Sequence, residues 1–223
     1  TLEEQIAKTR LELGRVSERL HKVRMEAAEV LEKHVTHELR ELAMESSVFR
    51  VDFSNKEDPQ GIPIGDKMLA AKANGIDSVE FLLSANPGEP PKPLAKIASG
   101  GEISRVMLAL KSILASVDEV STLIFDEIDV GIGGRVATVI GEKLAAIGRM
   151  RQVICVTHLP QIACMADTHY SITKEIEGGR ARTVVTQLQE IERVREIARM
   201  LGGDPGLDTA SMKHAKEMLR TAQ

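Results

Sequence analysis

The sequence is poor in aromatic residues: among 223 residues there are four Phe, one Tyr and no Trp. Proteins that bind single-stranded nucleic acid by base stacking need an aromatic platform, so this composition argues against that mode. There is no long hydrophobic run, and the chain opens with alternating charges instead of a basic and then apolar targeting segment. The sequence therefore predicts no membrane partner.

Neither sign of charge is in large excess, and cysteine is scarce. The formal net charge is −4, which argues against a protein that coats nucleic acid with its whole surface. The two cysteines, Cys155 and Cys164, lie in or near apolar segments without metal-ligand spacing. They are expected to be reduced thiols of a cytoplasmic protein.

The first segment has a heptad repeat. Mostly apolar residues recur at alternating spacings of four and three from Leu2 to Val30, over about four heptads. A lone helix cannot bury such a seam, so the pattern predicts a coiled coil with a partner helix. A surface helix packed on its own domain is the alternative interpretation.

The rest of the chain predicts a mixed α/β fold. Alternating apolar residues predict strands over 47–53 and 79–83, while the turn-forming residues of 54–75 predict a loop with at most one short element. After residue 97, helical patterns alternate with the short apolar strands 122–125 and 153–156. Continuous apolar strands between helices indicate a sheet covered on both faces. A hairpin around Gly178-Gly179 and further helices follow.

One candidate anion site opens the helix that follows residue 99. Ser99-Gly100-Gly101-Glu102 combines a hydroxyl, two glycines that admit a ligand close to the backbone, and the free N–H groups of a helix N-terminus. A terminal phosphate would suit this arrangement. A glycine pair before a helix is, however, often only a tight turn.

Two further candidate groups each follow an apolar strand. Asp126 and Glu127 come directly after strand 122–125, where Asp126 could hold Mg²⁺ through water and Glu127 could deprotonate an attacking water. His158 follows strand 153–156 and could donate to a phosphate oxygen. Taken singly, adjacent acids can be ordinary surface residues, and a lone His is more often structural.

Together, the three groups resemble the signature motif, the Walker B motif and the switch histidine of ABC-type ATPases, in that family's order. Asp129 then falls at the position of the D-loop. The resemblance is closest to the RecN family of bacterial SMC-like repair ATPases, through the segments KIASGGEISRVMLALK, TLIFDEIDVGIGGRVATVIGEKL and RQVICVTHLPQIACMAD.

The resemblance implies a division of the chain and a role for each site residue. Residues 1–45 would be the returning helix of a coiled-coil arm, and 46–223 the C-terminal lobe of an ABC/SMC-type ATPase head. Glu127 and His158 would be catalytic, and Asp126 would hold Mg²⁺ through water. Ser99, Gly100, Gly101 and Glu102 would bind, in trans, the ATP held by a second head.

No G-x-x-x-x-G-K-[ST] motif occurs in the sequence. In RecN-like proteins this P-loop precedes the arm, so the chain is expected to begin inside the arm and to need the N-terminal half of its head. The resemblance further implies ATP and Mg²⁺ as cofactors, homodimers of ATP-sandwiched heads, and double-stranded DNA ends as a partner in recombination and the SOS response. The alternatives are another SMC-like or ABC ATPase head, or a scaffold that never hydrolyses nucleotide.

Overall fold

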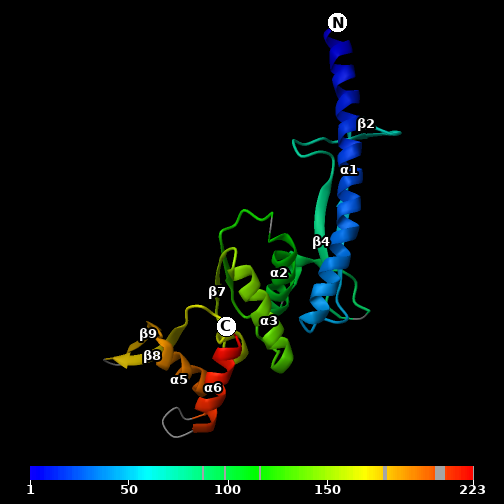
Figure 1. The fold of residues 1–223 in the computed structure, drawn as a ribbon. Coiled ribbons are helices and arrows are strands. Elements are labelled where there is room, and N and C mark those ends of the chain that lie inside the picture. The colour runs from blue at the N-terminus through cyan, green and yellow to red at the C-terminus, as the bar shows by residue number, and fades with distance from the viewer. Residues whose placement is uncertain (87, 98, 116, 178–179, 204–208, 223) are drawn as a thin grey trace. The chain divides into compact units, whose positions relative to one another are not determined.

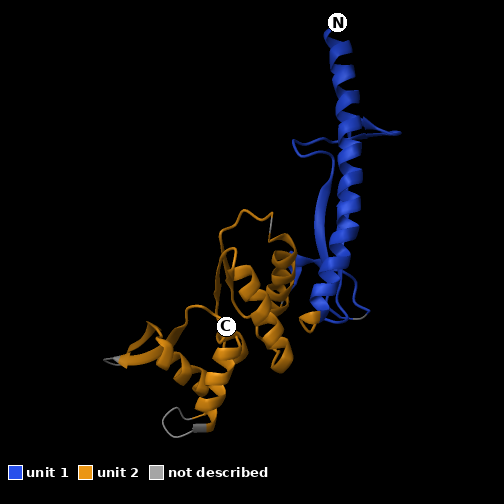
Figure 2. Cartoon of the chain, in the orientation of Figure 1, with its two compact units in different colours: residues 1–40, 44–98 blue, residues 41–43, 99–223 orange. Residues whose placement is uncertain are grey.

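The computed structural model describes residues 1–86, 88–97, 99–115, 117–177, 180–203 and 209–222. The chain divides into two compact units (Figure 2): 1–40 with 44–98, and 41–43 with 99–223. The division expected from the sequence, 1–45 and 46–223, differs from this one because the strands before residue 98 group with the long first helix. The mixed α/β composition with a long N-terminal helix is as expected.

Helix α1 (Leu2–Glu41) runs the length of the first unit (Figure 1). Small residues on one face let the strands of this unit approach closely: Gly14 and Ala28 are buried, and a Cβ built on Gly14 would lie 2.5 Å from the carbonyl oxygen of Pro63. On the heptad seam, Val16 and Val23 are 53% and 56% exposed. Most of the seam thus lies outside the face that packs on the strands, although Leu20 is half-buried and lies next to Gly75.

The strands of the first unit form two small antiparallel sheets. One has the order β1-β4-β5 and the other pairs β2 with β3. Their bounds are β1 Val48–Ser54, β2 Glu57–Ile64, β3 Lys67–Leu69, β4 Ser78–Ser84 and β5 Lys92–Pro93, followed by the 3-10 turn η1 Leu94–Lys96. The strands expected over 47–53 and 79–83 are confirmed as β1 and β4. The loop expected over 54–75 is wrong, because this segment forms the β2–β3 hairpin.

A buried carboxylate joins α1 to the strands. The Asp77 side chain is fully buried and accepts hydrogen bonds from His21 Nδ1 at 2.6 Å, Arg24 Nη1 at 3.0 Å and Asn55 Nδ2 at 3.3 Å. Burial alone would raise the pKa of Asp77, but the hydrogen bonds from Arg24, His21 and Asn55 outweigh it and lower that pKa. A buried charge is retained when it is paired in this way.

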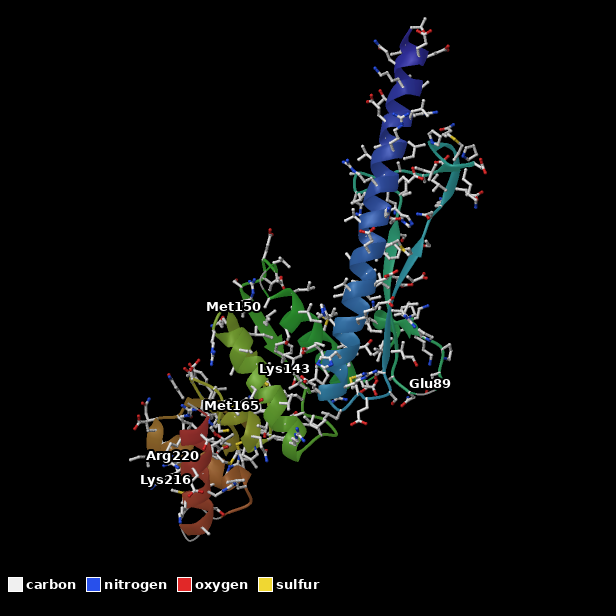
Figure 3. The ribbon with its side chains drawn as sticks, turned by 45° about the vertical axis from the view of Figure 1, so that its right-hand side comes forward. Glu89, Lys143, Met150, Met165, Lys216 and Arg220 are labelled. Carbon is white, nitrogen blue, oxygen red and sulfur yellow. The ribbon has the colours of Figure 1, made fainter. Side chains whose placement is uncertain are left out.

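The second unit is built on a parallel strand pair and its helices. Its first elements are α2 Gly100–Leu114, β6 Thr122–Phe125, α3 Gly134–Gly148, β7 Gln152–Cys155 and α4 Pro160–Ala163. Strands β6 and β7 pair in parallel, in register from Thr122–Gln152 to Phe125–Cys155. Gly141 of α3 admits α4, since a Cβ there would lie 3.1 Å from the Gln161 carbonyl oxygen; it would also lie 3.0 Å from Cγ of Met165, which follows α4 and is labelled in Figure 3.

Only one face of the β6–β7 pair is covered. Leu123 and Phe125 are buried, whereas Ile124 is 70% and Ile154 is 46% exposed. The expectation of a sheet covered on both faces is therefore wrong for this chain. The open face carries these two isoleucines beside the hydrogen-bonded pair Thr122 and Gln152.

The remainder of the second unit is a hairpin and two helices. Strands β8 (Tyr170–Glu177) and β9 (Arg180–Gln187) pair antiparallel as expected, and the turn expected at Gly178-Gly179 lies outside the described residues. Helices α5 (Glu190–Met200) and α6 (Thr209–Thr221) pack with α4 around a small core of Ala163, Cys164, Ile197, Ala198 and Ala215.

Candidate functional site

The parallel pairing of β6 and β7 brings two of the candidate groups to one edge of the sheet. Asp126 and Glu127 follow β6, and Thr157 and His158 follow β7. The carboxyl ends of parallel strands lie at the same edge, where ligands of open α/β sheets bind. The hydrogen bond from Val156 N to the Phe125 carbonyl, 2.9 Å, extends the pairing to this edge.

The third group, at the start of α2, lies against the same edge. Ser99 is the N-cap of α2, and its hydroxyl oxygen accepts a hydrogen bond from Glu102 N at 3.4 Å. The Ser99 hydroxyl thus satisfies one free N–H of the helix, as an N-cap serine does. Its own proton remains available for an anion at the helix N-terminus.

The two glycines make room for the turn that carries Glu127. A Cβ built on Gly100 would collide with Oε2 of Glu127, and one built on Gly101 would lie 3.1 Å from the Glu127 carbonyl oxygen. The expected role of these glycines was close approach of a ligand. In the structure they also admit a neighbouring segment of the chain, which ties the signature residues to the Walker B residues.

Glu127 has a left-handed backbone, with φ of +57°. This conformation costs a non-glycine residue about 1–3 kcal/mol and persists only where the surroundings enforce it. Hydrogen bonds within the turn provide part of that support: Glu127 N donates to Oδ1 of Asp126 at 2.9 Å, and Val130 N donates to the Glu127 carbonyl at 3.2 Å.

Two side chains of α2 hold the same turn from outside. Ser104 Oγ donates to the Asp126 carbonyl at 2.7 Å, and Arg105 Nη1 donates to the Val130 carbonyl at 3.1 Å. Arg105 is only 8% exposed, and burial lowers the pKa of its guanidinium, although the charge of Glu102 opposes this. Neither Ser104 nor Arg105 belongs to the candidate residues found from the sequence.

Asp129 joins the turn after β6 to the end of β7. Its Oδ2 accepts from Thr157 Oγ1 at 2.6 Å and from His158 N at 2.9 Å, and lies 2.9 Å from His158 Nδ1. Asp129 is buried, while the His158 side chain is 71% exposed. The carboxylate thus engages one ring nitrogen of His158, and the exposed Nε2 is available to a ligand.

The carboxylates at this edge also affect a neighbouring thiol. Burial, together with the charges of Asp129 and Asp126, raises the pKa of Cys155 to about 12. A thiol with so high a pKa is a poor nucleophile. Cys155 and Cys164 are both free.

The residues at this edge suit a hydrated cation. Mg²⁺ in phosphate-binding sites is held by one or two carboxylates together with phosphate oxygens and water. The exposed Asp126 carboxylate offers one such ligand. Among the described residues, no group of three or more His, Cys, Asp or Glu side chains is arranged to hold a metal by itself.

A mixed α/β fold with a long first helix, together with the three motifs in this order, is the arrangement expected of the class of ATPase heads that the sequence resembles. The chain is 46% identical over 221 residues to the DNA repair protein RecN of Halalkalibacterium halodurans, covering 99% of this chain and 38% of that protein. RecN of Streptomyces coelicolor is 45% identical, covering 96% of this chain and 37% of that protein. The chain belongs to the RecN family.

The chain therefore spans little more than a third of the length of the relatives it matches. No family model matches it. Among solved structures, an Smc head domain with an extended coiled coil from Pyrococcus furiosus is 17% identical, covering 83% of this chain and 42% of that chain, with a TM-score of 0.49. The SmcHead bound to the C-winged helix domain of ScpA is also 17% identical, with 80% and 48% covered and a TM-score of 0.45.

Proposed function

We propose that this chain is the C-terminal part of an ATPase head that uses ATP and Mg²⁺ to dimerise and to act on broken double-stranded DNA. Asp126 would hold Mg²⁺ through water, Glu127 would deprotonate the attacking water, and His158 would donate to the terminal phosphate. Ser99, Gly100, Gly101 and Glu102 would contact the nucleotide bound by a second head, and Asp129 would serve as the D-loop residue.

One observation carries this proposal: the three motifs meet at one edge of a parallel strand pair, joined by short contacts. Glu127 lies against Gly100 and Gly101, and Asp129 contacts both Thr157 and His158. Hydrolysis of a phosphoanhydride requires little covalent chemistry from the protein, so positioning and electrostatic stabilisation provide most of the catalysis. A general base, a cation ligand and a free helix N-terminus are the parts that this chemistry needs.

The remaining parts would come from the N-terminal half of the same head. The sequence has no P-loop, and the open face of β6–β7 exposes Ile124 and Ile154. A partner that adds strands or a helix over this face would bury both isoleucines. The exposed heptad seam on α1 supports a second contact, with the outgoing helix of a coiled-coil arm.

The proposed role in DNA repair rests on the relatives, which are named as DNA repair proteins. The homodimer of ATP-sandwiched heads would tether or organise double-stranded ends for recombination, within the SOS response and in the bacterial cytoplasm. Among the described residues, no helix combines the length and the apolar character needed to cross a bilayer.

Reassembly of the head tests the function. This chain alone is expected to show no ATP hydrolysis above background, because the phosphate-cradling loop and its Lys are missing. Adding the N-terminal half should restore turnover, and Glu127→Gln should then slow it by roughly 10²-fold or more while ATP-bound dimers accumulate. Tight ATP binding by this chain alone in calorimetry, or normal turnover in Glu127→Gln, would contradict the proposal.

A further inference from the structure

We infer that Arg105 is a positioning residue for hydrolysis, which holds the Glu127-bearing turn of its own subunit in its active conformation. The inference rests on the proposed function, because it assigns Arg105 a part in the same reaction. It differs from the role of the signature residues, which would contact the nucleotide of the opposite subunit.

The burial of Arg105 is the first observation. Arg105 is only 8% exposed, and a buried guanidinium is costly unless acceptors surround it. Its Nη1 donates to the Val130 carbonyl at 3.1 Å, while its Nε has no partner among the described residues. An apolar side chain would fill this position on α2 without that cost, so the contact with Val130 is what distinguishes arginine here.

The second observation is what Arg105 touches. Val130 closes the turn that begins at Glu127, through the hydrogen bond from Val130 N to the Glu127 carbonyl. These groups converge on Gly101: a Cβ there would lie 3.1 Å from the Glu127 carbonyl oxygen, 3.3 Å from Val130 Cβ and 3.4 Å from Arg105 Nη1. Arg105 thus binds the last residue of a turn whose first residue is the expected general base.

The third observation is the backbone of Glu127. A left-handed glutamate relaxes toward other conformations unless contacts hold it, and relaxation would move its carboxylate away from the attacking water. Ser104 restrains the start of the turn through the Asp126 carbonyl, and Arg105 restrains its end. Without Arg105, the end of the turn would lose its side-chain hydrogen bond to α2.

This geometry gives α2 two separable roles. Ser99 at its N-terminus would act on the nucleotide of the other subunit, so its loss should prevent ATP-dependent dimerisation. Arg105, further along the same helix, would act through Glu127 of its own subunit. Loss of Arg105 should therefore slow hydrolysis and leave dimerisation in place, as expected for Glu127→Gln.

The experiment uses the complete head, with the P-loop half present, and compares Arg105→Met with Glu127→Gln and Ser99→Arg. We expect Arg105→Met to lower kcat by about 10-fold or more, since small displacements of catalytic groups cost up to about 10²-fold. ATP-dependent dimers, measured by light scattering, should persist, and the KM for ATP should change by less than about threefold. Arg105→Lys, which can still donate to the Val130 carbonyl, should recover part of kcat.

Arg151→Met is the matched control. Arg151 is a partly buried arginine that also donates to loop carbonyls, of Val120 at 2.7 Å, of Ala115 at 2.9 Å and of Asp118, but at the opposite end of β6 and β7. The Arg151→Met substitution should reduce thermal stability without the selective loss of kcat that we expect for Arg105→Met.

Wild-type kcat in Arg105→Met, loss of its dimers as in Ser99→Arg, or an equal loss of kcat in Arg151→Met would each overturn the inference. If Arg105→Met does not fold, Arg105→Leu, which also lacks the donor to the Val130 carbonyl, decides: lowered kcat with dimers retained supports the role, and wild-type kcat overturns it. A wild-type head without ATP-dependent dimers or turnover would instead contradict the proposed function itself.

Discussion

At the residue scale, the site depends on how closely α2 approaches the turn after β6. Gly100 faces the flexible end of the Glu127 side chain, whereas Gly101 faces the Glu127 backbone and the Val130 side chain. A carboxylate can rotate away from a new methyl group at little cost. A backbone carbonyl in a restrained turn cannot, because its position is set by the hydrogen bonds of Ser104 and Arg105.

The two glycines should therefore respond differently to alanine. Gly101→Ala is expected to destabilise the chain by about 1–3 kcal/mol, as for overpacking in a filled site. Gly100→Ala should change stability by less than about 1 kcal/mol, because the lost backbone freedom of the unfolded chain offsets the movement of Glu127. Differential scanning calorimetry of the 223-residue chain measures both. Equal unfolding midpoints for the two variants would show that the backbone of the Glu127 turn moves as easily as the Glu127 side chain.

The sequence predicted the motifs of the site better than the contacts between them. The sequence predicted that Asp126, Glu127 and His158 each follow an apolar strand, and the parallel pairing of β6 and β7 then brings them to one edge. Arg105 could not be predicted, since a basic residue on a helix is ordinarily solvent-exposed. Its burial depends on where a non-local turn meets α2, which periodicity does not encode. The left-handed Glu127 is likewise a consequence of tertiary contacts.

At the scale of the elements, α1 presents two faces with different chemistry. The face toward the strands uses small and polar residues, including Gly14, His21 and Arg24, to contact the β2–β3 hairpin and Asp77. The heptad seam leaves Val16 and Val23 exposed. An apolar seam separate from the packed face is typical of a helix with a second partner.

Charged substitutions on the heptad seam should weaken binding of the outgoing arm helix without unfolding the chain. The double variant Val16→Asp with Val23→Asp is expected to change the stability of the chain by less than about 1 kcal/mol, since both side chains are exposed. The same variant should abolish binding of the outgoing arm helix, measured by analytical ultracentrifugation. Val35→Asp is the control, because Val35 is fully buried and an unpaired charge there should unfold the first unit. Unfolding by the seam variant would favour an ordinary packed helix.

The β2–β3 hairpin shows why one element was missed. Its sequence contains Pro59, Gly61 and Pro63 and lacks the apolar alternation of a half-buried strand. The hairpin is held by tertiary packing, through a small cluster of Ile62, Leu69 and Ile76 and the close approach of Pro63 to Gly14. The local sequence favours a loop, but contacts with α1 stabilise the hairpin instead. Strands β6 and β7, whose apolar character is local, were found within one residue of their bounds.

At the scale of the whole molecule, the open face of the β6–β7 pair is the main sign that the chain works as part of a larger fold. Parallel sheets occur almost only with both faces covered, yet Ile124 and Ile154 remain exposed while Leu123 and Phe125 are buried. The P-loop half of the head, as proposed above, would supply the missing cover and bring the phosphate-binding loop to the edge that carries Glu127.

Removing the apolar side chains from this face should weaken assembly of the head without unfolding the chain. Ile124→Ser with Ile154→Ser is expected to raise the Kd for the P-loop half by roughly 100-fold, because two isoleucines contribute about 3 kcal/mol when buried. Isothermal titration calorimetry between the two halves measures this effect. The control is Ile172→Ser with Ile176→Ser on β8, where both side chains are 60% or more exposed and no partner is proposed; it should leave the Kd unchanged. Equal affinity in all three proteins would mean that another surface joins the halves, and equal weakening by the control would indicate a general effect of lost apolar surface.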